Sequence, residues 1–168
     1  ITHVHKFNEQ AQTCWHDFNK RFQSLDKYID FYLFQLPPSH TPKRISPLEE
    51  FIRATGLKER FALECRNDAW FQPEYLKWAG DLGITWVSID APAFSREIYR
   101  TTDYVYLRMH GRTGWYNHDY QQAELEEIAR RMIATAPQAV YVFFNNNHHM
   151  LVNAQQMYNV LKKIDDRA

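Results

Sequence analysis

Charged and polar side chains follow each of five short apolar segments, at the positions where buried strands would end. Alternate residues of a strand point to the same face, so Glu64 shares a face with Arg66, and Arg108 with His110. The carboxyl ends of parallel strands meet at one edge of a sheet, so we expect these side chains to line one cavity. The catalytic candidates are Glu64, Asp90 and His110, and the candidates for substrate binding are His3, Gln35, Arg66, Arg108, Arg112, Trp115, Tyr116, Asn145, Asn147 and His148.

The chemistry of this set is proton transfer beside a bound anion. Carboxylates and imidazole transfer protons near neutral pH, and arginines bind phosphate or carboxylate groups through paired N–H donors. With Glu64 or Asp90 as base and His110 as acid, the set predicts acid–base chemistry on a small anionic substrate, phosphorylated or sugar-like. A structural interpretation also stands, in which the same residues form ion pairs around the mouth of the fold. The pattern is not specific to any one reaction.

A metal site is a competing interpretation that the spacing does not favour. Its ligands would come from His3, Glu64, Asp90, His110 and His148, and no two of these have a dedicated ligand spacing. The neighbouring arginines would also repel a cation. We therefore predict neither a metal nor a cofactor, and a metal-dependent hydrolase remains an alternative.

The segment 110–116 has two glycines and two aromatic residues directly after a predicted strand. Trp115 or Tyr116 stacking on a ring-bearing ligand is one interpretation. Packing of the loop onto the rim of the fold is the other. Cys65 points away from the face of Glu64, so we expect it in the core.

The elements that position these residues alternate along the chain. Strand and helix patterns in alternation predict a parallel sheet with right-handed crossovers, and the lack of a glycine-rich phosphate turn disfavours a dinucleotide-binding fold. We predict one α/β domain over 1–168, a TIM (β/α)8-type barrel that lacks its first two or so β/α units, because a full barrel takes roughly 250 residues. Ser46, Pro47 and Glu49 predict a capping box at the second helix, and Gly56 and Gly83 predict helix ends. Strands are predicted at 31–36, 61–65, 84–89, 104–109 and 139–144, and helices at 8–28, 46–56, 73–82, 121–135 and 151–161.

The composition is that of an ordinary globular protein, with 20 Lys and Arg against 20 Asp and Glu. This balance speaks against a nonspecific nucleic-acid binder and a membrane-surface protein, although it does not exclude nucleic acid. No apolar run approaches the roughly 18 residues of a membrane span. The two cysteines lack metal-type spacing and fit buried thiols of a reducing compartment, so we expect a cytoplasmic protein.

Several motifs together resemble the YecE-like family, also called domain of unknown function 72. They are Ile1-Thr2-His3, Gln35-Leu36-Pro37-Pro38, Phe61-Ala62-Leu63-Glu64-Cys65-Arg66 with Trp70-Phe71, Asp90-Ala91-Pro92, the segment 104–112 with Trp115-Tyr116, and Phe143 to His148. The resemblance implies a TIM barrel and places Ile1-Thr2-His3 at the end of its third strand. It also implies that an N-terminal part of the same barrel accompanies this chain. The family's signature positions correspond to His3, Gln35, Glu64, Arg66, Asp90, Arg108, His110, Arg112, Tyr116 and Asn145.

The family has no established reaction, so three hypotheses remain open. The first is a metal-independent enzyme acting on a small anionic molecule. The second is a binding module for nucleic acid or protein that uses the arginine and aromatic rim without turnover. The third is a rigid rim of ion pairs, in which Glu64→Gln would lower stability alone.

Overall fold

The computed structural model describes residue 7 and residues 10–165. Five strands alternate with helices and are hydrogen-bonded in the order β1-β2-β3-β4-β5, so the predicted α/β class is confirmed. The chain divides into two compact units, residues 1–87 and 88–168. Among the described residues, no helix combines the length and the apolarity needed to cross a bilayer. In chain order, the helices and strands are α1 (Ala11–Phe22), β1 (Tyr32–Leu36), α2 (Ile45–Thr55), β2 (Phe61–Cys65), α3 (Pro73–Leu82), β3 (Thr85–Asp90), β4 (Tyr104–Met109), α4 (Gln122–Ala134), β5 (Ala139–Phe144) and α5 (Met150–Asp165).

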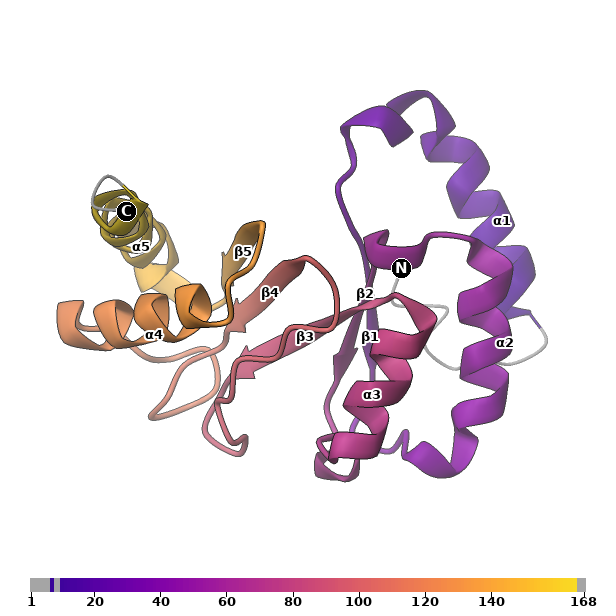
Figure 1. Ribbon diagram of the computed structural model, residues 1–168, viewed down its shortest axis with the longest axis horizontal. Coiled ribbons are helices and arrows are strands. Elements are labelled where there is room, and N and C mark those ends of the chain that lie inside the picture. The colour runs from indigo at the N-terminus through magenta and orange to yellow at the C-terminus, as the bar shows by residue number, and fades with distance from the viewer. Residues whose placement is uncertain (1–6, 8–9, 166–168) are drawn as a thin grey trace. The chain divides into compact units, whose positions relative to one another are not determined.

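In the first unit, β1 and β2 are parallel, and Gln35 is the register partner of Glu64. Trp15 of α1 packs against Tyr32 and Phe34, and Phe34 stacks on Phe61 with ring centroids 4.0 Å apart. Alternate residues of each strand therefore face the helices, where α1 and α2 lie side by side (Figure 1). Gln35 and Glu64 point to the opposite face of the sheet.

In the second unit, β4 and β5 are parallel over their whole length. Val105, Leu107 and Met109 are buried against the apolar residues of α4 and α5, which Figure 1 shows beside these strands. Because side chains alternate along a strand, Tyr106 and Arg108 point to the face that α4 and α5 do not cover.

The first helix is shorter than predicted. The pattern predicts helix over 8–28, but α1 ends at Phe22 and a 3₁₀ helix, Gln23–Tyr28, follows. Arg60 explains the change, because its Nη2 donates to the backbone carbonyl of Asp26 at 3.1 Å and to the Asp26 carboxylate at 2.8 Å. Arg60, which directly precedes β2, thus binds both the backbone carbonyl and the carboxylate of Asp26. In a continued α-helix the Asp26 carbonyl would instead accept a hydrogen bond from within the helix.

The capping box predicted at Ser46 is wrong. The helix α2 begins at Ile45, with Arg44 at the N-cap and no side-chain cap, after a 3₁₀ turn that Pro42 begins. Glu49 instead accepts hydrogen bonds from Trp78 Nε1 and from Arg53, which lower the pKa of its carboxyl. The predicted helix ends are confirmed, since Gly56 and Gly83 adopt left-handed φ angles of 64° and 68°.

Candidate functional site

Glu64 lies at the carboxyl end of β2, with its side chain fully buried. Its Oε2 accepts a hydrogen bond from Gln35 Nε2 at 3.0 Å, and its Oε1 accepts one from Arg66 Nε at 2.9 Å. The parallel register explains the first contact, because it places Gln35 beside Glu64 on the same face. A buried carboxylate held by an amide and a guanidinium is oriented and charged, which suits a base that accepts a proton.

Cys65 confirms the prediction that it belongs to the core. Its side chain is fully buried, and burial, together with the charge of Glu64, raises the pKa of its thiol. A thiol in this environment is a poor nucleophile.

Arg108 and Asn145 lie at the carboxyl ends of β4 and β5. Arg108 is 9% exposed and points away from the core beneath α4 and α5, and its Nη2 donates to Asn145 Oδ1 at 2.9 Å. The backbone N–H of Asn145 donates to the carbonyl of Met109, which keeps the chain after β5 beside the end of β4. A guanidinium held in place at a strand end can bind an anion through its paired N–H donors.

His110 follows β4 directly and is fully buried. Its backbone N–H donates to the carbonyl of Asp90 at 2.8 Å. Its ring lies 5.3 Å from the ring of Trp115 and 5.5 Å from that of Tyr116, and both aromatic side chains remain more than one-third exposed. Packing of these aromatics against His110 is therefore present, and their stacking on a ligand stays a prediction.

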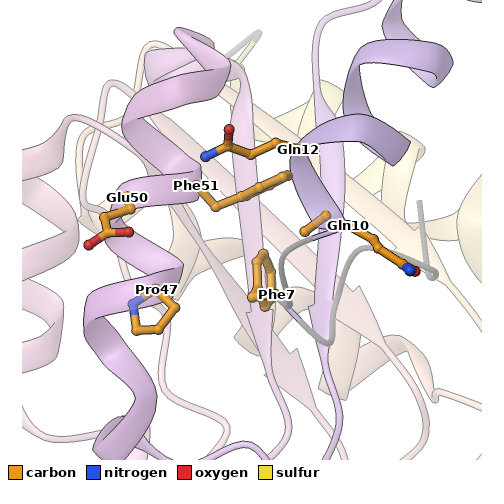
Figure 2. A pocket seen from close by; sticks show the side chains of 7 residues that line it. Phe7, Gln10, Gln12, Pro47, Glu50 and Phe51 are labelled. Atoms are coloured by element: carbon orange, nitrogen blue, oxygen red, sulfur yellow. The ribbon is translucent and has the colours of Figure 1, made fainter.

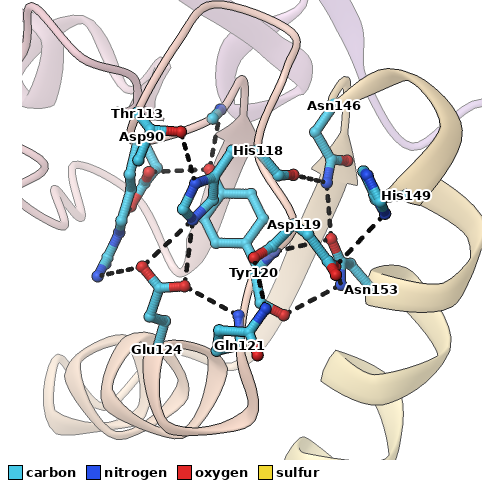
Figure 3. A network of polar contacts seen from close by, with 12 residues as sticks. Asp90, Thr113, His118, Asp119, Tyr120, Gln121, Glu124, Asn146, His149 and Asn153 are labelled. Carbon is cyan, nitrogen blue, oxygen red and sulfur yellow. Dashed lines mark hydrogen bonds and ion pairs between the residues drawn. The ribbon is translucent and has the colours of Figure 1, made fainter.

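The turn after His110 depends on a tyrosine that the sequence did not reveal. Gly111 has a φ of 110°, and a Cβ there would lie 2.5 Å from the carbonyl oxygen of Gly114, so only glycine fits. The N–H of Gly111 donates to the hydroxyl of Tyr120 at 2.9 Å, and that hydroxyl donates to Asp90 Oδ1 at 2.8 Å (Figure 3). Burial, followed by the charge of Asp90, raises the pKa of Tyr120 far above its ordinary value. Tyr120 stands alone between a loop and a helix, where neither helical nor strand periodicity marks it.

Arg112 contacts three carboxylates. Its Nε donates to Asp90 Oδ2 at 3.0 Å, its Nη2 donates to Glu127 at 2.9 Å, and its Nη1 lies 3.5 Å from Glu124. Burial alone would lower the pKa of Arg112, but the charge of Asp90 and the bonds to Glu127 raise it. This is the ion-pair network that the structural interpretation predicted, and a role for Arg112 in holding a substrate stays a prediction.

The loops after β4 and β5 are both fastened to α5 through Asn153. Asn153 Oδ1 accepts from the N–H of Tyr120 and from Asn146 Nδ2, while its Nδ2 donates to Asp119 and to the carbonyl of Tyr120 (Figure 3). Asn146 is fully buried and donates also to the carbonyl of His118. The strand-end pattern predicts neither Asn146 nor Asn153 as a candidate site residue.

The remaining predicted site residues are placed as follows. Asn147 and His148 are exposed in a 3₁₀ turn, Asn147–His149, and their predicted binding role stays a prediction. His3 lies outside the described residues. The carboxylate of Asp90 accepts a hydrogen bond from Arg112, and the backbone carbonyl of Asp90 accepts one from the N–H of His110. Glu64 belongs to the first unit and His110 to the second, so their convergence stays a prediction.

A cavity of about 490 Å³ opens between the first turns of α1 and α2. Figure 2 shows the rings of Phe7 and Phe51 and the carboxylate of Glu50 around it. Its lining includes none of the predicted site residues. Within the described part of the chain, no three His, Cys, Asp or Glu side chains are grouped as a metal ion would require.

The fold and the strand-end residues define an α/β protein with polar groups at the carboxyl ends of its strands. The family model described as "Protein of unknown function DUF72" matches residues 1–167, so the chain belongs to this family, as its motifs indicated.

Two solved structures of the same family show the fold. A DUF72 family protein from Thermotoga maritima has a TM-score of 0.75 and 26% identity over 88% of this chain. One from Enterococcus faecalis has a TM-score of 0.82 and 20% identity over 95% of this chain. The matches span 64% and 71% of those two chains, respectively. No curated protein matches the sequence.

Proposed function

We propose that the protein binds a small anionic molecule at the carboxyl ends of its strands and transfers protons on it. The observation that carries the proposal is the pair of Arg108 and Asn145, joined at 2.9 Å at the ends of β4 and β5, with Arg108 pointing away from the core beneath α4 and α5. In open parallel sheets and in barrels, ligands bind at this edge. Arg108 supplies the charge, and Asn145 fixes the direction in which the guanidinium points.

Glu64 and His110 are the groups we assign to proton transfer. Glu64 is a buried carboxylate whose two oxygens are oriented by Gln35 and Arg66, as a base requires. His110 supplies the acid. Asp90 is assigned a positioning role instead, because both of its carboxylate oxygens accept hydrogen bonds from Tyr120 and Arg112, which hold the turn after His110.

We also infer that the five strands are part of a (β/α)8 barrel, as the family resemblance implies, with the first β/α units supplied by an N-terminal part of the same barrel. The alternation of parallel strands with helices supports this inference. Cys14 and Cys65 are both free thiols, which fits a reducing compartment such as the cytoplasm, although Cys14 is exposed and not buried as predicted.

Calorimetric titration with inorganic phosphate tests the binding half of the proposal. The wild-type protein is expected to bind phosphate saturably, and Arg108→Met to lose that binding. Arg108→Lys keeps the charge but not the planar fork, so it should bind more weakly than wild type. Arg130→Met is the matched control, since Arg130 is an exposed arginine of α4. Equal binding by wild type and Arg108→Met would refute the assignment.

Hydrogen exchange in D2O tests the catalytic half. A proton-transferring enzyme exchanges a carbon-bound proton of its substrate for deuterium, which ¹H NMR detects. We expect exchange in at least one member of a panel of phosphorylated sugars, and we expect Glu64→Gln to abolish it. A panel without exchange, beside intact phosphate binding, would leave the protein as a binding module.

A further inference from the structure

Aromatic rings lie beside Arg108 on the face of β4 and β5 that points away from α4 and α5. Phe143 is the register partner of Arg108, and it stacks on Tyr106 with ring centroids 4.8 Å apart and an interplanar angle of 23°. The side chain of Phe143 is 43% exposed, although it belongs to a strand. If Arg108 only contacted water or formed an ion pair, it would not need aromatic side chains beside it on β4 and β5.

The loop after His110 adds two more exposed rings. Trp115 and Tyr116 are 37% and 36% exposed and both contact the His110 ring. Tyr116 is held in a left-handed conformation with a φ of 61°, which is unfavourable for a residue with a Cβ, and its N–H donates to the carbonyl of His110 at 2.6 Å. Such backbone conformations cluster at functional sites, which supports a functional role for this exposed ring.

The cation and the rings lie within the reach of one small molecule. Arg108 and His110 are two residues apart, which corresponds to roughly 6.6 Å along a strand. The ring centroid of Trp115 lies 5.3 Å from that of His110. A molecule in which a short sugar joins a planar ring to a phosphate could place its ring on these aromatic side chains and its phosphate at Arg108.

We propose that the anion carries a planar aromatic ring, as a nucleotide does, with the ring stacked on Trp115 or Tyr116 and the phosphate at Arg108 and Asn145. This inference rests on the proposed function, because it names the class of molecule that the same anion site takes. Stacking of a base on an aromatic side chain supplies affinity with little sequence preference, so the structure assigns the class of the ligand and not the base.

The test compares three probes by calorimetry on the complete protein: adenosine 5′-monophosphate, ribose 5-phosphate and adenosine. The nucleotide is expected to bind about tenfold or more tightly than the sugar phosphate. Of the five tryptophans in the sequence, Trp15, Trp70 and Trp86 are buried, Trp78 is half-buried and Trp115 is exposed. Quenching of tryptophan fluorescence by the nucleotide that is lost in Trp115→Leu therefore reports on the loop.

A double variant and a matched control test the two rings directly. Trp115→Leu and Tyr116→Leu together are expected to weaken nucleotide binding about tenfold or more and to leave ribose 5-phosphate binding unchanged. Tyr158→Leu, which removes another exposed ring of the same unit, is the matched control and should change neither.

The outcomes separate this inference from the proposed function. Equal affinity for nucleotide and sugar phosphate, or no effect of the double variant, overturns the ring inference and leaves the anion site intact. Adenosine binding as tightly as the nucleotide overturns the anion site. Binding of none of the three probes, together with no binding of inorganic phosphate, overturns both.

Discussion

Replacing Tyr120 with phenylalanine removes one oxygen atom from the support of the His110 turn. The hydroxyl accepts a hydrogen bond from the N–H of Gly111 at 2.9 Å and donates one to Asp90 Oδ1 at 2.8 Å. Tyr120 is 1% exposed, so water does not replace either bond without rearrangement. The ring itself, which belongs to the core under α4 and α5, is retained in the variant.

The cost follows from the two bonds. A hydrogen bond to a charged group contributes about 1.5–3 kcal/mol, and a neutral one about 0.5–1.5 kcal/mol. Because Arg112 still neutralises Asp90, we expect the lower part of the sum, about 2–3 kcal/mol in the free energy of unfolding. For a protein of this size the melting temperature should fall by about 4–12 °C.

Urea denaturation followed by circular dichroism measures the change, with Tyr158→Phe as the matched control. Tyr158 is 62% exposed, so loss of its hydroxyl should alter stability by less than about 0.5 kcal/mol. If Tyr120→Phe and Tyr158→Phe unfold at the same urea concentration, the hydroxyl of Tyr120 does not support the turn, and the positioning role assigned to it and to Asp90 is wrong.

Three further changes test the surrounding network. Gly111→Ala should destabilise the protein by more than about 1 kcal/mol, because the added Cβ meets the carbonyl of Gly114, and a melting curve equal to wild type would contradict this. Asn153→Ala should cost about 2 kcal/mol or more in urea denaturation, since several buried hydrogen bonds lose their partner, and a loss below 0.5 kcal/mol would refute its central role. Burial would raise the pKa of the Glu127 carboxyl, but hydrogen bonds from Arg112 and Arg131 lower it below its ordinary value of 4.5. The ion pairs of Glu127 therefore stabilise the protein fully above pH 4.5, and this contribution is lost as the pH falls through the lowered pKa. The difference in stability between wild type and Glu127→Gln should therefore shrink below that pH, and a difference independent of pH would contradict the ion pair.

The order and type of the main helices and strands could be predicted because the burial of their faces determines where apolar residues occur along the sequence. Runs such as 61–65 are apolar, and in this structure every residue of β2 is buried, Glu64 included. A polar residue inside or directly after such a run is conspicuous, so the positions of Gln35, Glu64, Arg108 and His110 alone make them candidate site residues. Glycines at helix ends were equally informative, since Gly56 and Gly83 adopt conformations that other residues avoid.

The contacts that could not be predicted join residues distant in sequence. The sequence shows Asp90 and Arg112 at strand ends but not that they bind each other, or that Glu124 and Glu127 of α4 complete the set. The same limit hid the bond from Trp78 to Glu49, which competes with the capping box predicted from local spacing. Local patterns fix which side chains are near a strand end, whereas tertiary packing decides which partner each one takes.

The anion site is tested most directly by a phosphate titration followed by ¹H–¹⁵N NMR of the arginine side chains. We expect the Nε–H signal of Arg108 to move saturably as phosphate is added, and that of the exposed Arg130 to stay in place. A stationary Arg108 signal at phosphate concentrations that shift Arg130 would contradict the anion site at the ends of β4 and β5.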